Sequence, residues 1–235
     1  MSRIAVVAAL EREVAPLIRD WKQRVAQSSG RKYRLFEKGN VTLVCGGIGR
    51  EASRRATEAV IREVQPSRIV SVGFVGALDP KLPVGEIVEP RTIIDAHDGS
   101  RTDTGQGDGV LVSFASVASR DQKEKLRKAY ADAAVVDMEA AAVAQGAQSR
   151  GVPFSVLKAV SDVASFDMPD MQRFVSSDGR FRVGMFAFHV AVRPWQWSST
   201  LSLAVNSRKA SRALCAALEK FLMRVRNEES MKEVL

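Results

Sequence analysis

The sequence predicts a single α/β domain in which helices cover both faces of a central sheet, a three-layer α/β/α arrangement. Short runs rich in β-branched residues alternate with longer helical stretches, which is typical of α/β sheets. No Pro-, Gly- or Ser-rich linker divides the 235 residues, and this length fits one large domain as well as two small ones. We therefore assign residues 1–198 to one domain and residues 199–235 to a helical extension packed on it.

The individual elements follow from the same alternation. Strands are predicted near residues 3–10, 41–45, 68–74, 84–94, 110–114 and 154–161. Helices are predicted near residues 11–24, 50–65, 120–130, 138–149 and 199–226. The run near 154–161 is almost wholly apolar, as expected of a central strand buried on both faces. Residues 97–109 are rich in turn formers and are predicted to be a loop.

The composition is that of an ordinary soluble protein, with 46% hydrophobic and 26% charged residues. The two cysteines, Cys45 and Cys215, lie far apart in the sequence, which favours a reduced, cytoplasmic protein over a disulfide framework. The apolar run from Ile4 to Leu10 is short and Glu11 follows at once, so a buried strand fits better than a signal peptide. No apolar run approaches the roughly 20 residues that span a membrane.

The chain is basic, with 35 Lys and Arg residues against 27 Asp and Glu residues and a formal charge of +8. Nucleic-acid binding is one interpretation, but the basic residues are dispersed. Arg54 and Arg55, for example, share a predicted helix with Glu51 and Glu58. No aromatic stacking platform accompanies them. We therefore expect no nucleic-acid partner and attribute the charge to solubility or to attraction of an anionic surface or substrate.

Acidic residues mark two strand ends in the segment 135–162. Asp137 and Glu139 open an Ala-rich helix that Gly151 is well placed to end, and Asp162 follows the next apolar run. Ligands of open α/β sheets bind outside the carboxyl ends of strands, so Glu139 and Asp162 are expected to face one crevice. The plainer alternative is that these acids only favour a helix dipole or cap a helix.

Several motifs in this chain resemble those of the nucleoside phosphorylase and nucleosidase superfamily. The block V-D-M-E-A-A-A-V-A, then G-V-P-F and K-A-V-S-D, is most similar to the branch that contains methylthioadenosine/S-adenosylhomocysteine nucleosidase. Four further segments resemble family motifs in the expected order: Ile4–Val14, Cys45–Arg50, Val72–Leu78 and Pro83–Val88. The resemblance covers residues 3–98 and 135–163, and it implies a mixed, twisted central sheet.

The resemblance also implies a mechanism for cleaving a purine N-glycosidic bond through an oxocarbenium-like transition state. Asp162 would protonate or hydrogen-bond the leaving purine, and Ser161 would orient Asp162. Glu13 would activate water on the opposite face of the sugar. Glu139 would hold the ribose hydroxyls, with Met138 packed against the sugar. The remaining substrate-binding residues implied by the resemblance are Leu10, Ile48, Gly73, Phe74 and Gly76.

Taken alone, these residue types have simpler explanations: an acid such as Glu13 is usually solvated, and a methionine such as Met138 usually packs in a core. The chain also departs from the family, because Phe74 stands where the family usually has serine. No arginine set clearly matches a phosphate clamp, although Arg12 and Arg50 permit one. Hydrolysis is therefore favoured, with phosphate a co-substrate only if the protein is a phosphorylase. No Cys/His spacing predicts a metal, and the glycines at 46–49 lack a dinucleotide-binding pattern, so no cofactor is expected.

The C-terminal part resembles a divergent branch, the hopanoid-associated phosphorylases, which are thought to remove adenine from an adenosylated triterpenoid. Its apolar run Val183–Val192, followed by Trp195 and Trp197, suits a lipid-like ligand or membrane surface, or a core helix. His189 in that run is expected to be a core or surface residue, and His97 a structural or interface residue. A non-catalytic nucleoside-binding protein is the third alternative. By resemblance, we expect a homodimer or a higher homo-oligomer.

Overall fold

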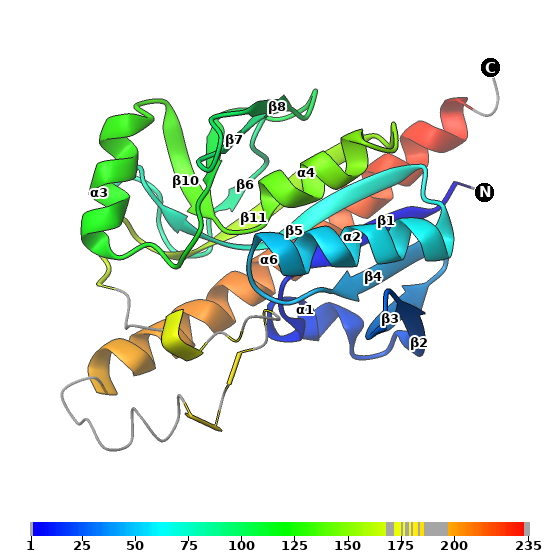
Figure 1. The fold of residues 1–235 in the computed structure, drawn as a ribbon, viewed down its shortest axis with the longest axis horizontal. Helices are drawn as coiled ribbons and strands as arrows, with labels where there is room; N and C mark the ends of the chain where they lie inside the picture. The colour runs from blue at the N-terminus through cyan, green and yellow to red at the C-terminus, as the bar shows by residue number, and fades with distance from the viewer. Residues whose placement is uncertain are drawn as a thin grey trace.

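One large mixed sheet runs through the protein, with helices on both of its faces (Figure 1). The computed structural model describes residues 2–167, 172–174, 176, 179, 181–182, 184–185 and 197–232. Within this part of the chain the strand order is β2-β3-β4-β1-β5-β10-β9-β7-β8, and β11 pairs with β5 and β6. The predicted α/β class and mixed sheet are therefore confirmed.

The strands are β1 Ile4–Ala8, β2 Lys22–Ser28, β3 Arg31–Lys38, β4 Val41–Cys45, β5 Arg68–Ala77, β6 Ile87–Val88, β7 Thr92–Asp95, β8 Arg101–Asp103, β9 Val110–Ser113, β10 Ala133–Asp137 and β11 Phe154–Asp162. The helices are α1 Glu11–Ile18, α2 Arg50–Val64, α3 Arg120–Ala129, α4 Ala140–Gln148 and α6 Trp197–Lys232, with a 3₁₀ turn at Gln172–Phe174.

Alternation along the strands divides the core into two layers. Ala5 and Val7 of β1 belong to a cluster with α2 and α4 on one face of the sheet. Ile4 and Val6 belong to a cluster with α1 and α6 on the other face. Successive side chains of a strand point to opposite faces, so an apolar strand needs helices on both sides. Figure 1 shows this sandwich, with α2 and α4 on one side of the sheet and α6 on the other.

The central strand β5 shares one edge between two strands of opposite direction. Its first half, Arg68–Ser71, pairs in parallel with β1. Near its end, Gly76 and Ala77 pair with the antiparallel strand β10. The other edge of β5 pairs with β11 from Ile69 to Gly76. The strands β1 and β10 therefore diverge along β5 between residues 71 and 76, and the segments that follow them face each other there.

The prediction of a helix over residues 11–24 is wrong at its C-terminal end. Helix α1 ends at Ile18, and Lys22–Ser28 forms the edge strand β2, which pairs antiparallel with β3. Ser29 and Gly30 turn the chain between them with φ of 48° and 75°, as hairpin turns require. β2 lies at the end of the sheet, and its many exposed polar residues hide the apolar signal by which strands are recognised.

Three other predictions about local structure also need correction. The strand over 84–94 is two strands, β6 and β7, and Pro90 between them has no N–H for a ladder. The predicted loop 97–109 contains β8, which pairs with β7. Helix α4 begins at Ala140 and not at residue 138, so Met138 and Glu139 lie in the link after β10. The apolar run of residues 183–192, except 184 and 185, and Trp195 lie outside the described residues.

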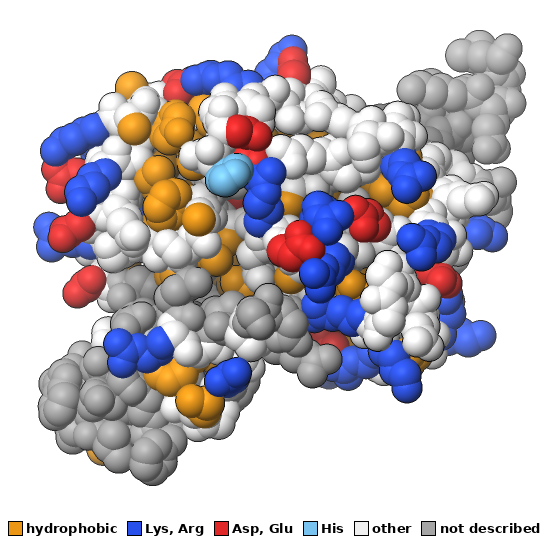
Figure 2. Space-filling model, in the orientation of Figure 1, with side chains coloured by type: hydrophobic (Ala, Val, Ile, Leu, Met, Phe, Trp, Pro, Cys, Tyr) orange, Lys and Arg blue, Asp and Glu red, His pale blue; other side chains and the backbone are white. Residues whose placement is uncertain are grey.

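Charged side chains on α2 are largely matched within the helix. Arg54 pairs with Glu51 and Glu58, and Arg55 pairs with Glu51. Figure 2 shows basic and acidic side chains interleaved over this helix. Among the described residues, no helix combines the length and apolar character needed to cross a membrane. The domain boundary at residue 198 stays a prediction.

The packing of α6 on the sheet predicts a large effect of shortening Leu214, which is fully buried beside β1 and β11. We expect Leu214→Ala to lower the free energy of unfolding by about 2–5 kcal/mol, because it leaves a cavity. The control Leu201→Ala removes a side chain on the same helix that is 66% exposed, and it should change stability by less than about 0.5 kcal/mol. Denaturant unfolding measures both, and equal effects would contradict this packing.

Candidate active site

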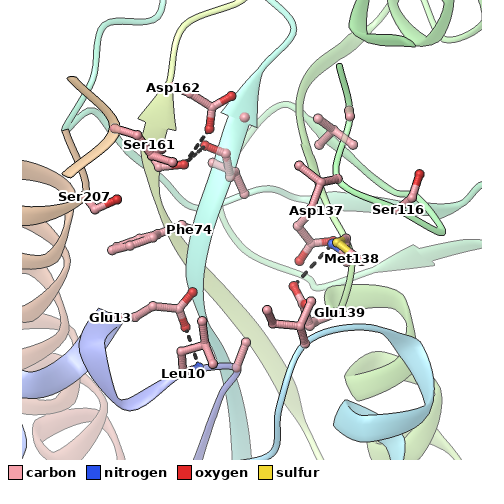
Figure 3. A pocket seen from close by; sticks show the side chains of 18 of the residues that line it. Leu10, Glu13, Phe74, Ser116, Asp137, Met138, Glu139, Ser161, Asp162 and Ser207 are labelled. Atoms are coloured by element: carbon pink, nitrogen blue, oxygen red, sulfur yellow. Dashed lines mark hydrogen bonds between the residues drawn. The ribbon is translucent and has the colours of Figure 1, made fainter. Parts of the chain in front are cut away.

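Carboxylates from three separate segments face one crevice where β1 and β10 diverge along β5 (Figure 3). Glu13 comes from α1, Glu139 from the link after β10, and Asp162 from the end of β11. The figure shows Asp162 at one end of the pocket, with Glu13 and Glu139 at the other end on opposite sides. The described residues that line it are Ala9, Leu10, Arg12, Glu13, Ile48, Phe74, Val75, Gly76, Ser116, Val117, Ala118, Lys123, Val136, Asp137, Met138, Glu139, Ser161, Asp162, Leu203 and Ser207.

Asp162 is held by two hydrogen-bond donors. Ser161 Oγ donates to Asp162 Oδ1 over 2.6 Å, and Lys123 Nζ forms a buried ion pair with Asp162 Oδ2. The pairing register of β11 shifts between Val160 and Asp162, an irregularity that re-aims side chains at strand ends. The Asp162 carboxylate is therefore fixed at the rim of the sheet and is nearly inaccessible to solvent.

Glu13 lies in the first turn of α1 and points back toward the residue before the helix. Leu10 N–H donates to Glu13 Oε2 over 3.0 Å, which satisfies one of the free amides at the helix start. Gly73 runs directly behind this carboxylate, since a Cβ there would lie 3.4 Å from Glu13 Oε2. Burial raises the pKa of Glu13 above its usual value, and the nearby Lys158 and Arg12 cations partly oppose that rise.

Glu139 lies directly before α4 and connects this helix to the glycine turn after β4. Its carboxylate accepts hydrogen bonds from Gly49 N–H at 2.8 Å and from Met138 N–H at 3.2 Å. Burial, followed by the neighbouring Asp137 carboxylate, raises the pKa of Glu139 to about 7. Glu139 is therefore a carboxylate close to its titration point at neutral pH.

A buried lysine, Lys158, balances these acids without lining the pocket itself. Lys158 Nζ contacts Asp137 Oδ2 at 2.8 Å, and both side chains are almost completely buried. Asp137 also accepts hydrogen bonds from Ser113 Oγ at 2.6 Å and from Ala140 N–H at 2.9 Å. Burial disfavours the charged lysine, but the carboxylates of Asp137, Glu139 and Glu13 outweigh it and raise the pKa of Lys158. The ammonium thus compensates a cluster of negative charge.

The structure brings nine of the ten sequence-predicted site residues to this pocket. The tenth residue, Gly73, does not line the pocket, because it lies behind the Glu13 carboxylate. Phe74, at the position where the sequence resemblance leads us to expect serine, lines the pocket beside Leu203 and Ser207 of α6. It also lines an adjoining groove that contains Pro16 and Ala204. The ring therefore forms a wall between the pocket and this groove, and the catalytic and binding roles of these residues stay predictions.

Sequence reasoning missed Lys123, Lys158 and Ser116. A lysine inside the apolar run of β11 was a usable signal for Lys158, because such a residue must be paired when buried. Lys123 gave no signal, since it lies among other charged residues of α3. Arg50, considered for a phosphate clamp, instead pairs with Asp95 and donates to Gln145 Oε1 over 3.0 Å. Arg12 does line the pocket, and its guanidinium stacks 5.5 Å from the Phe181 ring.

The mixed sheet and the acid-lined crevice at its switch point define an α/β enzyme with a site for a small molecule. The Phosphorylase superfamily model matches residues 3–120 and 107–182, and the chain belongs to that superfamily. It is therefore an enzyme of the nucleosidase or nucleoside phosphorylase type. This membership confirms the resemblance of the sequence motifs to the nucleoside phosphorylase and nucleosidase superfamily. The resemblance of the C-terminal part to the hopanoid-associated phosphorylases stays a prediction.

Two curated relatives and two solved structures give the extent of the similarity. The 5′-methylthioadenosine/S-adenosylhomocysteine nucleosidase of Marinomonas sp. (strain MWYL1) is 27% identical over 208 residues, 72% of this chain and 89% of the relative. Its counterpart in Staphylococcus aureus (strain MRSA252) is 26% identical over 200 residues, 69% and 87%. Arabidopsis thaliana 5′-methylthioadenosine nucleosidase superposes with a TM-score of 0.72 at 18% identity, covering 96% of each chain. Futalosine hydrolase of Helicobacter pylori strain 26695 gives 0.65 at 18%, covering 93% and 98%.

The raised pKa of Glu139 predicts a pH-dependent stability. Below its usual 4.5 the carboxyl is protonated in both states, whereas between 4.5 and about 7 only the unfolded chain ionises. The free energy of unfolding should therefore fall across this window as pH rises, by about 3 kcal/mol from this group. In Glu139→Gln that loss is absent, so the free energy of unfolding of the variant should rise relative to that of the wild-type protein from pH 4.5 to 7. Urea unfolding at several pH values measures the difference, and a constant difference would contradict it.

Proposed function

We propose that the protein hydrolyses the N-glycosidic bond of a 5′-substituted adenosine and releases adenine. The observation that supports this most is the arrangement of Glu13 and Asp162 at opposite ends of one pocket, with Glu139 across from Glu13 (Figure 3). Two separated carboxyl groups suit a reaction in which one group serves the leaving base and the other serves the attacking water. No cofactor takes part in this scheme.

The purine would lie at the Asp162 end of the pocket. Its departure from C1′ leaves negative charge on the ring, which a proton or strong hydrogen bond at an imidazole nitrogen neutralises. Asp162, oriented by the 2.6 Å hydrogen bond from Ser161, would deliver that hydrogen bond. Ser116 and Val117 line the same pocket and would contact the base.

The sugar would lie between Glu13 and Glu139. Burial raises the pKa of Glu13, which brings a general base nearer to neutral pH, where proton transfer is most effective. Glu139 would accept hydrogen bonds from the ribose hydroxyls, and Met138 would pack against the ring. The negative charge of the two carboxylates would also stabilise the oxocarbenium-like sugar.

The 5′ substituent of the nucleoside would lie in a groove next to the pocket. The relatives are named for methylthioadenosine, S-adenosylhomocysteine and futalosine, so the fold accommodates different groups. In this chain a groove between α1 and α6 adjoins the pocket. Its lining combines apolar residues such as Pro16, Phe74 and Leu203 with three arginines, Arg12, Arg208 and Arg212. We infer that the 5′ group leaves the pocket along this groove. We also expect a homo-oligomer.

Phosphorolysis, acting on an adenosyl nucleoside with a lipid-like 5′ group, is the second candidate. Two observations favour it: Arg12 lines the pocket as a cation, and the adjoining groove offers apolar residues such as Phe74 and Leu203 beside the arginines Arg208 and Arg212. Hydrolysis stays the first candidate because Arg50, the second cation considered for a phosphate clamp, is engaged by Asp95 and Gln145. Arg208 and Arg212 line the adjoining groove together with Arg12 but, unlike Arg12, they do not line the pocket itself. A purely non-catalytic binding role lacks support, since the curated relatives are nucleosidases.

The acceptor is tested with Glu13→Gln and 5′-methylthioadenosine, with and without phosphate. We expect the wild-type protein to release adenine without phosphate. Glu13→Gln should lose roughly two to four orders of magnitude in kcat, the scale of a lost general base, while still binding substrate. Glu11→Gln, an acid of the same helix that pairs with Arg34, is the matched control and should keep its activity. A strict phosphate requirement with a sugar 1-phosphate product would promote the phosphorylase candidate instead.

The role of Glu139 predicts discrimination against 2′-deoxynucleosides. Removing the 2′-hydroxyl leaves the Glu139 carboxylate poorly paired, so the deoxy analogue should lose about 2 kcal/mol of transition-state binding, roughly thirtyfold in kcat/KM. Glu139→Gln should narrow the ratio between the two substrates. Equal kcat/KM values for 5′-methylthioadenosine and its 2′-deoxy analogue with the wild-type enzyme would remove Glu139 from this role.

A further inference from the structure

Lys123 is a buried lysine on a helix that is otherwise highly charged and exposed. Helix α3 turns two residues inward, Lys123 and Leu126, which lie three apart and therefore on one face. The Lys123 side chain is only 3% exposed. An ammonium group at such a position is costly unless it is paired, and an apolar residue would pack there without that cost.

The partner of Lys123 is the Asp162 carboxylate of the proposed mechanism. Lys123 Nζ is ion-paired with Asp162 Oδ2 and donates a second hydrogen bond to the Val163 carbonyl at 2.9 Å. The approach depends on Gly76, because a Cβ at that residue would lie 3.0 Å from both Asp162 Oδ2 and Lys123 Cε. β5 therefore leaves space for this contact.

Because of this contact, the proposed reaction needs a source for the proton that Asp162 gives to the purine. An ionised carboxylate only accepts hydrogen bonds, so an Asp162 carboxylate that is ion-paired with the Lys123 ammonium has no proton of its own to give. Asp162 Oδ1 already accepts from Ser161. A departing purine needs a proton, and Lys123 is the charged donor that touches Asp162 among the described residues.

We propose that Lys123 supplies the proton that leaves with the purine, acting through Asp162; this inference rests on the proposed function. As the C1′–N9 bond breaks, its electron pair moves onto the purine. A proton passes from Lys123 Nζ to Asp162 Oδ2, and Asp162 gives a proton to the purine. The attacking water bonds to C1′ and loses its proton to Glu13. Lys123 is left neutral and Glu13 is left protonated. Lys123 then takes a proton from water, and Glu13 releases its proton to water.

A second cavity offers Lys123 a separate route to solvent. Lys123 lines the active-site pocket and also a neighbouring cavity formed with Arg120, Glu124 and Arg127. The walls of that cavity include Val163, whose carbonyl accepts from Lys123. Water on the α3 side therefore restores the lysine proton without passing the bound nucleoside.

The test compares two substrates that differ in their need for a proton. The first is 5′-methylthioadenosine, and the second is 4-nitrophenyl 5-methylthio-β-D-ribofuranoside, whose nitrophenolate leaves unprotonated. For Lys123→Met we expect kcat on the adenosine to fall by about two to four orders of magnitude, with KM little changed. On the nitrophenyl riboside the loss should stay below about tenfold, since no general acid is needed. Lys125→Met, the same substitution at an exposed position of α3, is the matched control and should behave as wild type on both.

Lys123→Arg separates proton supply from charge. Arginine keeps the cation but does not release its proton, so this variant should lose adenosine cleavage and keep nitrophenyl riboside cleavage. Recovery of adenosine cleavage by Lys123→Arg, or equal losses on the two substrates in either variant, would overturn the inference and leave Lys123 a structural cation. If wild-type protein releases adenine and Lys123→Met does so equally well, only the inference fails. If wild-type protein releases none from 5′-methylthioadenosine, the proposed function fails and the inference with it.

Discussion

The shared edge of β5 is the constraint on which the site depends. β1 occupies the first half of that edge, and β10 reaches its end from the opposite direction. Because two strands cannot occupy the same edge, their continuations separate, and α1 and the β10–α4 link face each other across the gap. The parallel strand β11 on the far edge then brings Asp162 opposite Gly76. A change in strand order at this point would disperse Glu13, Glu139 and Asp162.

The crevice concentrates negative charge in a region shielded from water, so the fold needs cations to balance it. Lys158 pairs with Asp137, and Lys123 pairs with Asp162 at the end of β11. Each lysine offsets the cost of burying its carboxylate, because leaving a buried charge unpaired destabilises a protein by about 3–5 kcal/mol. Glu13 and Glu139 have no ion-pair partner of this kind among the described contacts, and their pKa values rise. The pairing pattern thus separates two kinds of acid within one pocket.

The wall that carries Phe74 distinguishes this pocket from the pattern expected of the superfamily. The ring stands between the crevice and the groove along α6, so one residue belongs to the surroundings of both. Leu203 and Ser207 of α6 complete the same wall. The long C-terminal helix therefore contributes to the pocket as well as to the core, where Leu214 and Leu218 pack. Because one part of α6 lines the pocket and another part packs in the core, this helix links the stability of the sheet to the shape of the site.

The α/β class and the acids of the site could be predicted from the sequence, because both leave local signals: apolar runs alternate with helical stretches, and Glu13, Glu139 and Asp162 stand within recognisable motifs. It did not reveal the hairpin of β2 and β3, since an edge strand exposes polar side chains that obscure its period. The lysines that pair with Asp162 and Asp137 could be identified only in the folded structure. Lys123 and Asp162 lie 39 residues apart, and their contact depends on how α3 packs beside the end of β11. Ion pairs of this kind are set by the three-dimensional path of the chain, and no periodicity in the sequence encodes that path.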